Sequence, residues 1–322
     1  MKIIVTHASP DWDAIGSVWL LKKYFPGWSD AVVEFVPAGQ RSPRSRISGE
    51  QQANPVEIVG EDEIVHVDTG MGPLDHHQIY DMNVCGASRV WDFVKEQNPD
   101  LHAPSDKEKV RIEAVDRIVK VIVEMDHFQE VFWADPAADH QEFSALGILD
   151  GLKLYKMDQD GYYVEFGVTC LEALMHRFEN RLWAEQEIEE NGIKFETKWG
   201  RGMGFETLND DVLKLAQKMG YRIVIRKDPR KGYVRIKGMP EMANGEWKMP
   251  PVASLASGGV NGERAKEVDF TLIYEKLSKI DPEATWYLHV SKKMLLNGTP
   301  KNPKMVPTKL SLEQIIEVLK SA

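Results

Sequence analysis

The stretch MKIIVTHASPDWDAIGS, residues 1–17, decides the fold that we expect for this chain. The apolar run at residues 3–5 predicts a short buried strand, and the pattern then changes to polar and turn-forming residues. From Ala14 onward the apolar positions recur at helical spacing, until Pro26 and Gly27 end the helix. A strand, an acidic turn and a helix in succession open an α/β sheet, in which ligands bind at the carboxyl ends of the strands. One imidazole and two carboxylates lie in this turn: His7, Asp11 and Asp13.

A second strand end of the same character lies at residues 64–68, which read IVHVD. A glycine-containing turn follows it, and then the sequence Leu74-Asp75-His76-His77. Carboxylates and imidazoles at two strand ends of one α/β domain predict a site for a hard or borderline divalent metal ion. Asp13 also has the position of a helix cap, because Asp is a favoured N-cap residue and Asp13 precedes the helical pattern.

Together these motifs resemble those of the DHH phosphoesterase superfamily, which includes RecJ exonucleases, oligoribonucleases of the NrnA type and family II inorganic pyrophosphatases. Residues 7–17 are similar to the first motif of that family, Asp68 to its second and residues 75–77 to its third. The three motifs cover about the first quarter of the chain. Trp12 departs from the pattern, since the family usually has a small residue between the two aspartates, and its bulk would narrow the site.

The resemblance implies a centre of two metal ions bridged by Asp68. One ion would be held by His7, Asp11 and Asp68, and the other by Asp13, Asp68, His76 and Asp126. This mixture of oxygen and nitrogen ligands suits Mn²⁺, with Mg²⁺ or Co²⁺ as alternatives. His77 would contact a phosphate oxygen or protonate the leaving group, and Asp75 would orient an imidazole from behind.

The family has a fourth metal-binding aspartate beyond the double histidine. Asp126 is the leading candidate, because it lies at the end of a helix predicted over residues 105–124. Asp150 and Asp135 are the alternatives. Another helix is predicted to begin at residues 86–88, where backbone N–H groups could face an anion or Ser88 could cap the helix.

The length of 322 residues favours two domains. We expect an α/β protein with a mostly parallel N-terminal sheet and flanking helices over residues 1–167, a connector helix over 168–192, and a smaller α/β domain over 193–322. Residues 152–168 are predicted to form a β-hairpin, because aromatic residues flank an Asp-Gly turn. In the second domain, strands are predicted at 221–225 and 233–236.

The net charge of −10 makes long nucleic acid an unexpected partner. No apolar run approaches the roughly 20 residues of a membrane span, and the chain opens on a strand, not on a signal peptide. Two cysteines are too few for a disulfide framework. We therefore expect a cytoplasmic protein without membrane contact; the oligomeric state is open, with a homodimer as one option.

Several basic segments stand out against this acidic background. The resemblance implies a second domain that offers cations to substrate phosphate, and the candidates are Arg226, Arg230, Lys231, Arg235 and Arg264; solvated surface charge is the alternative. Glycine-rich pieces at 199–204 and 257–262 predict flexible loops, or backbone cradles for an anion. Residues 40–52, with three arginines, predict a solvated loop or an arm that holds phosphate.

The function predicted from these features is metal-dependent hydrolysis of a small phosphodiester or phosphate ester, such as a short oligonucleotide or nucleotide. One alternative is a phosphoanhydride hydrolase similar to an inorganic pyrophosphatase. The other, from a different class, is a non-catalytic module that senses a nucleotide.

Overall fold

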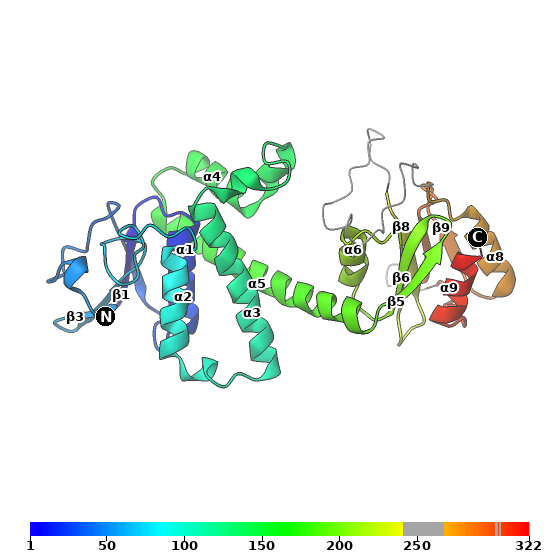
Figure 1. The fold of residues 1–322 in the computed structure, drawn as a ribbon, viewed down its shortest axis with the longest axis horizontal. Helices are drawn as coiled ribbons and strands as arrows, with labels where there is room; N and C mark the ends of the chain where they lie inside the picture. Colours follow the sequence, from blue (N-terminus) through cyan, green and yellow to red (C-terminus); the bar gives the residue numbers. More distant parts are fainter. Residues whose placement is uncertain (241–266, 300–301, 303, 322) are drawn as a thin grey trace. The chain divides into compact units, whose positions relative to one another are not determined.

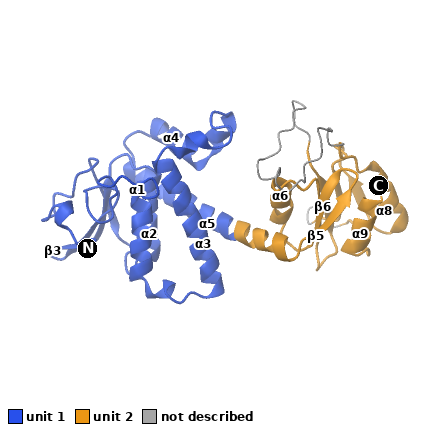
Figure 2. Ribbon diagram, viewed as in Figure 1, with its two compact units in different colours: residues 1–179 blue, residues 180–322 orange. Residues whose placement is uncertain are grey.

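The computed structural model describes residues 1–240, 267–299, 302 and 304–321. The chain forms two compact units, residues 1–179 and 180–322 (Figure 2). Strands and helices contribute to both units, so the predicted α/β class is confirmed. Arg264 and the glycine-rich piece at 257–262 lie outside the described residues.

The first unit is built on a four-stranded sheet. Its strands are β1 (Lys2–His7), β2 (Val32–Val36), β3 (Val56–Val59) and β4 (Asp62–His66), in the spatial order β2-β1-β4-β3. β1 pairs in parallel with β2 and β4, and β3 pairs antiparallel with β4 at one edge. The mostly parallel sheet is therefore confirmed. Because β1 and β4 are parallel neighbours, the residues that follow them emerge at the same edge of the sheet.

Helices α1 (Trp12–Tyr24), α2 (Gly86–Gln97) and α3 (Asp106–Asp126) pack against one another in this unit (Figure 1). Their buried residues Trp19, Trp91 and Ile118 join Ile4 and Val65 of the sheet in one hydrophobic core. α3 confirms the helix predicted over 105–124, and its N-cap Ser105 forms a capping box with Glu108. The first unit is thus a sheet and a helical layer that share one core.

The hairpin predicted over residues 152–168 is wrong. Helices α4 (Ala145–Tyr155) and α5 (Asp160–Glu190) occupy this stretch, and the Asp-Gly pair lies in the first turn of α5. Tyr163, Val164 and Leu171 are buried at helical spacing and pack in the core of the first unit. The burial of one helix face therefore outweighs the turn signal of the Asp-Gly pair, and the stretch is helical. The long helix ends at Glu190, before the Asn-Gly pair that the sequence indicated as its end.

Gly167 of α5 lies against α1, and this contact gives a test of the packing. A Cβ at residue 167 would lie 2.6 Å from Ile15 Cγ2, whereas a Cβ at Gly161 of the same helix would have no described atom within 4 Å. We expect Gly167→Ala to lower the free energy of unfolding by about 1–3 kcal/mol through overpacking. Gly161→Ala should leave it unchanged or raise it by up to about 1 kcal/mol. Urea denaturation of both variants measures the difference; equal stabilities would contradict the close approach of α5 to α1.

The second unit contains a six-stranded sheet. In spatial order its strands are β5 (Ile193–Thr197), β6 (Gly200–Glu206), β7 (Ile223–Lys227), β8 (Val234–Gly238), β10 (Met294–Asn297) and β9 (Trp286–Leu288). β6 and β7 are parallel and the other pairs are antiparallel. Among its described residues, the end of α5 is followed by the helices α6 (Asp211–Lys218), α8 (Thr271–Ile280) and α9 (Leu312–Lys320). β7 and β8 confirm the two strands predicted around the turn at residues 228–232.

The glycine-rich piece at 199–204 is neither a flexible loop nor an anion cradle, as the sequence suggested, because it forms most of β6. A Cβ at Gly202 would lie 2.3 Å from the ring of Phe195, and a Cβ at Gly204 would lie 2.9 Å from Ile316 Cδ1. The missing side chains make room for these core residues. The glycines therefore serve the packing of the second unit.

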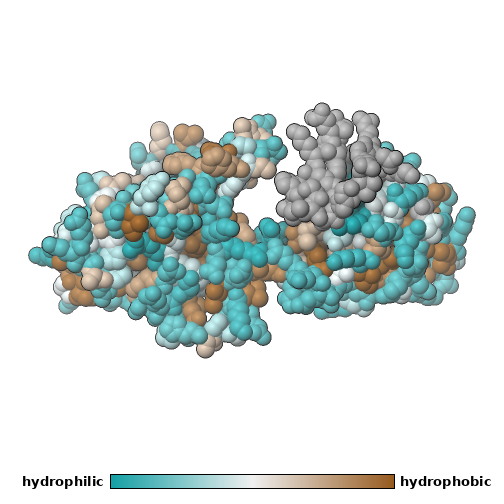
Figure 3. Space-filling view, in the orientation of Figure 1, coloured by the Kyte–Doolittle hydropathy of each residue, from teal (hydrophilic) through white to brown (hydrophobic). Residues whose placement is uncertain are grey.

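Short 3-10 helices complete the fold at Gly49–Gln51, Pro99–Leu101, Gln129–Phe132 and Asp139–Phe143. Large apolar side chains are exposed over residues 128–162, and the space-filling view shows them gathered over α4 (Figure 3). This part of the first unit buries less of its apolar surface than the helical core does. Among the helices of the described residues, none combines the length and apolar character that crossing a bilayer requires.

Candidate metal centre

The turn after β1 is shaped by Asp11, which caps helix α1. Its Oδ1 accepts hydrogen bonds from the backbone N–H groups of Asp13 (3.0 Å) and Ala14 (3.1 Å). The helix begins at Trp12, so the cap that the sequence assigned to Asp13 belongs to Asp11 instead. Trp12, whose bulk was expected to narrow the site, is buried in the hydrophobic core. Asp13 is thereby free for another role.

Asp68 follows β4 in a left-handed backbone conformation, with φ of 52°. A non-glycine residue in this region costs on the order of 1–3 kcal/mol and persists only where the surroundings hold it. The backbone N–H of Asp68 donates to the carbonyl oxygen of Leu74 at 3.1 Å, which closes the loop between β4 and the double histidine. The carboxylate is buried beside β1. This loop brings the second and third motifs to the first.

His7 and two carboxylates form the first group of the centre. His7 Nε2 lies 3.1 Å from Asp68 Oδ2 and 3.8 Å from Asp11 Oδ1. His7 Nδ1 lies 2.9 Å from the carbonyl oxygen of Ala8, and because a carbonyl only accepts, Nδ1 carries a proton. Although burial opposes it, hydrogen bonds with Asp11 and Asp68 raise the pKa of His7 to about 11. A divalent cation could replace this proton at His7 Nε2.

His76 and three carboxylates form the second group. His76 Nε2 lies 3.5 Å from Asp68 Oδ1, 3.6 Å from Asp13 Oδ2 and 3.6 Å from Asp126 Oδ2. Within the described part of the chain, three of these buried atoms have no hydrogen-bond partner: Asp68 Oδ1, His76 Nε2 and Asp126 Oδ2. Buried polar atoms are normally satisfied. Ligand atoms about 2.0–2.2 Å from one ion lie about 3–3.6 Å from each other, so these residues fit a divalent cation.

The N-terminus of α2 holds the carboxylate of Asp13. The backbone N–H groups of Gly86 and Ala87 donate to Asp13 Oδ2 at 2.6 Å and to Oδ1 at 2.5 Å. The anion expected at this helix end is therefore the protein's own side chain, while Ser88 caps the helix by accepting from the N–H of Cys85 at 3.0 Å. Burial and the nearby charges of Asp68 and Asp126 raise the pKa of Asp13 well above its usual range. Crowded carboxylates of this kind are stabilised by a bound cation.

Asp75 and His77 form a pair beside the two groups, and His77 Nδ1 lies 3.8 Å from Asp68 Oδ1. The fully buried Asp75 accepts from His77 Nδ1 at 2.7 Å and from the backbone N–H of Met71 at 2.7 Å. Although burial opposes it, the hydrogen bond from His77 lowers the pKa of Asp75, so the carboxylate is ionised and Nδ1 carries the proton. The half-exposed ring is left with Nε2 for other contacts. This arrangement matches the orienting role expected for Asp75.

The geometry separates the three candidates for the fourth aspartate. Asp126 lies at the end of α3 with Oδ2 in the second group, whereas Asp135 and Asp150 are exposed and take part in none of the ligand clusters formed by the described residues. The five candidate ligands from the first three motifs converge with Asp126 at one edge of the sheet. His7, Asp11, Asp13, Asp68, His76 and Asp126 are thus brought together.

Two side chains near the centre were missed by the sequence analysis. His127 Nε2 donates to the carbonyl oxygen of Val84 at 3.0 Å and lies 3.8 Å from Asp126 Oδ2; its position next to Asp126 was the available signal. Lys153 Nζ donates to the carbonyl oxygen of Ser9 at 3.1 Å, and its charge contributes to a lowered pKa of Asp11, after the larger effects of burial, which opposes, and of His7. No sequence pattern marks Lys153, because only the packing of α4 brings it here.

In the second unit, the predicted basic residues separate into two pairs. Arg226 and Arg235 lie opposite each other on β7 and β8, and both form ion pairs with Asp210. Arg226 is buried and also donates to the carbonyl oxygen of Thr207 at 2.8 Å. Arg230 and Lys231 lie in the exposed turn, where their backbone N–H groups donate to Asp228. The free guanidinium groups expected at Arg226 and Arg235 are thus occupied within the unit.

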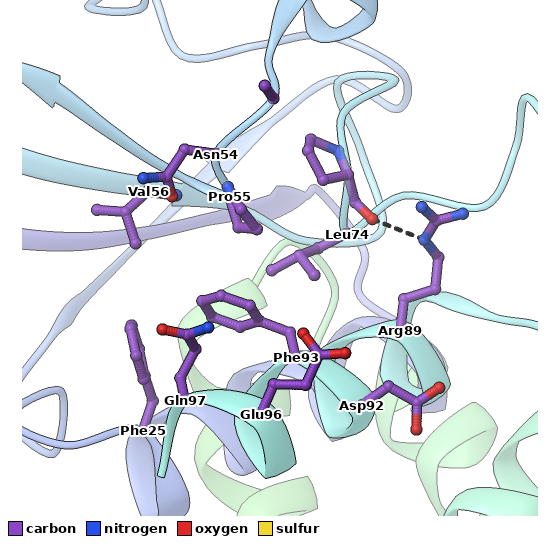
Figure 4. A pocket seen from close by; sticks show the side chains of 12 residues that line it. Phe25, Asn54, Pro55, Val56, Leu74, Arg89, Asp92, Phe93, Glu96 and Gln97 are labelled. Atoms are coloured by element: carbon purple, nitrogen blue, oxygen red, sulfur yellow. Dashed lines mark hydrogen bonds between the residues drawn. The ribbon is translucent and has the colours of Figure 1, made fainter.

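The first unit also contains a cavity of about 790 Å³, whose lining residues are shown in Figure 4. Residues of α2 and of the segment before β3 line it, and Arg89 Nε donates across one side to the carbonyl oxygen of Pro73 at 2.6 Å. None of the six candidate metal ligands lines this cavity. The candidate ligands at the sheet edge and this cavity are therefore separate features of the first unit.

Comparison with the models of known protein families gives no match for this chain, and no curated protein matches it.

Proposed function

We propose that this protein is a phosphoesterase of the DHH type that hydrolyses a small phosphodiester or phosphate ester, such as a short oligonucleotide or nucleotide, with two divalent ions. Mn²⁺ is the ion that we favour, with Mg²⁺ or Co²⁺ as alternatives. One observation carries the proposal: Asp68 directs Oδ2 toward His7 at 3.1 Å and Oδ1 toward His76 at 3.5 Å. A carboxylate between two groups of ligands suits a bridge between two cations.

The donor set supports this chemistry. His7, Asp11 and Asp68 would hold one ion, and Asp13, Asp68, His76 and Asp126 the other. Such ions supply Lewis acidity and charge neutralisation for attack on phosphorus. The backbone N–H groups of α2 hold Asp13 in place, and the cap of α1 holds Asp11. Ligands fixed in this way meet their ion with little reorganisation.

His77 is placed to handle a proton. Asp75 accepts from Nδ1, which fixes that nitrogen as the proton carrier, and the His77 side chain is half-exposed. Nε2 would donate to a phosphate oxygen or give its proton to the leaving group, and Asp75 would stabilise the charged ring. This role needs both residues, because without the buried carboxylate the ring would be free to rotate.

The composition supports a small substrate. A chain with net charge −10 gains no long-range attraction for a polyanion, so capture has to depend on local charge. Both cysteines are free, which fits a reducing compartment, and we place the activity in the cytoplasm.

Arg230 and Lys231 are the predicted phosphate contacts whose side chains lie in an exposed turn. We expect Arg230→Ala combined with Lys231→Ala to raise KM for a dinucleotide by about threefold to tenfold with kcat unchanged, because lost binding contacts act on capture. The effect should shrink at higher ionic strength. Lys279→Ala combined with Lys309→Ala removes two exposed lysines elsewhere in the unit and serves as control. Equal KM values for the two double variants would show that Arg230 and Lys231 are solvated surface charges without a role in substrate capture.

The proposal is tested by metal analysis of the purified protein and by hydrolysis assays with bis-p-nitrophenyl phosphate, a dinucleotide and pyrophosphate. We expect bound divalent metal and phosphodiester hydrolysis that a chelator abolishes and Mn²⁺ restores. Exclusive hydrolysis of pyrophosphate would favour the phosphoanhydride alternative. Nucleotide binding without hydrolysis of any of the three compounds would favour the sensing module.

A further inference from the structure

Residues 40–52 form a segment that lies beside the Asp68 loop, and we name it the bracing segment. The sequence predicted a solvated loop or an arm that holds phosphate, but Ser42, Gly49 and Gln52 are buried. The Arg41 side chain is only 13% exposed, against 46% for Arg44. Arg41 is neither solvated nor available to hold phosphate, because its guanidinium group forms hydrogen bonds within the protein.

Each nitrogen of the Arg41 guanidinium group has a partner. Nη1 donates to the carbonyl oxygen of Gly70 at 3.2 Å, and Nη2 donates to Gln52 Oε1 at 2.7 Å and Glu57 Oε2 at 3.0 Å. Nε donates to Ser45 Oγ at 3.1 Å. The Glu57 carboxylate is buried on β3. Buried ion pairs add little net stability, because desolvation offsets their attraction, so a role in fixing geometry suits this pair better.

Two further contacts connect the bracing segment to the same loop. Thr69 Oγ1 donates to the carbonyl oxygen of Gln40 at 3.0 Å. Gly49 approaches the loop backbone so closely that a Cβ there would lie 2.0 Å from the carbonyl oxygen of Gly70 and 2.5 Å from the carbonyl carbon of Met71. Backbone atoms cannot move aside as a flexible side chain can. The segment therefore rests directly on residues 69–71.

The loop needs such support. Asp68, Gly70 and Met71 all have left-handed backbone conformations, with φ of 52°, 80° and 56°. Two of the three are not glycine, and such conformations persist where surrounding contacts impose them. The conformation at Asp68 sets the direction of its carboxylate, whose two oxygens face His7 and His76. Contacts that hold residues 69–71 therefore act on the orientation of Asp68.

We infer that Arg41 is a positioning residue for the metal centre: with the close approach of Gly49, it holds the 69–71 loop so that the two oxygens of Asp68 face their separate ligand groups. The inference rests on the proposed function, since it concerns the ligand that would bridge the ions. Residues that orient metal ligands from behind affect metal affinity as strongly as some ligands do.

The test is calorimetric titration of the full chain with Mn²⁺. We expect Arg41→Gln to weaken Mn²⁺ binding about tenfold to a hundredfold, the usual effect of removing such a partner. Arg44→Gln is the matched control, because Arg44 belongs to the same segment but forms exposed ion pairs with Glu34 and Asp62. It should change affinity by less than about twofold, as an exposed pair contributes little.

Two further variants keep the test valid if Arg41→Gln does not fold. Arg41→Lys retains a charge for Glu57, but a single ammonium group cannot also reach Gly70 and Gln52 as the fork does. In Gly49→Ala, the added Cβ would collide with the backbone of Gly70 and Met71 and so displace the loop. Both should weaken Mn²⁺ binding in proteins whose circular dichroism and metal-free melting curves remain cooperative. Wild-type affinity in both variants, or equal affinity of Arg41→Gln and Arg44→Gln, overturns the inference and leaves the proposed function standing. Absence of Mn²⁺ binding by the wild type rejects both.

Discussion

Replacing Asp68 by Asn should lower kcat for the proposed phosphodiester hydrolysis by at least about a thousandfold, because the metal ions of such a site would supply several kcal/mol of stabilisation and each 1.36 kcal/mol is tenfold in rate. Asp68 faces both His7 and His76, so the substitution would disturb both proposed ions at once. The change is nearly isosteric, and the loss should come with weaker Mn²⁺ binding in calorimetry.

Asp150→Asn is the matched control for this experiment. Asp150 is an exposed residue of α4 and was an alternative ligand on sequence grounds. Its variant should keep wild-type kcat and Mn²⁺ affinity. Equal losses in the two variants would instead favour Asp150 as a ligand, and retained activity in Asp68→Asn would reject the bridge.

The second large effect is expected at His77. His77→Gln should lower kcat for a dinucleotide by about a hundredfold to ten-thousandfold, the usual contribution of a general acid or base. A p-nitrophenyl ester should lose much less, because its leaving group needs no proton. Asp75→Asn should show the same substrate dependence, since Asp75 fixes the ring through Nδ1.

His140→Gln is the control for His77, because it removes an exposed histidine of the same unit. It should leave both substrates unaffected. Mn²⁺ affinity should stay near wild type in His77→Gln, which separates proton transfer from loss of metal. A uniform loss for both substrates, together with weaker Mn²⁺ binding, would show that His77 acts as a metal ligand and not as an acid.

The convergence of the five candidate ligands from the first three motifs was predictable from local patterns. His7 and Asp68 each follow a short apolar run, and parallel neighbouring strands end at one edge of a sheet. The order of the motifs therefore indicated that the side chains would meet. The choice among Asp126, Asp135 and Asp150 was not predictable, because no local pattern distinguishes the three acidic residues, and only the docking of α3 brings Asp126 to His76.

Other features depended on contacts that no local pattern records. The Asp-Gly pair at residues 160–161 has turn chemistry, yet the burial of Tyr163 and Leu171 on one helix face outweighs it. Arg41 resembles its neighbour Arg44 in sequence, but only Arg41 meets the buried Glu57 of β3. In both examples, contacts between residues far apart in the sequence decide the structure. The same kind of contact explains the glycine-rich piece at 199–204, which was predicted to be a loop but forms most of strand β6.

The central claim is that Asp68 joins two cation sites, and anomalous diffraction from crystals grown with Mn²⁺ tests it most directly. We predict two Mn²⁺ peaks on either side of the Asp68 carboxylate, one in contact with His7 and Asp11 and the other with Asp13, His76 and Asp126. Soaking with a chelator should remove both peaks. Absence of Mn²⁺ from this edge of the sheet, or a single peak that does not touch Asp68, would contradict the account.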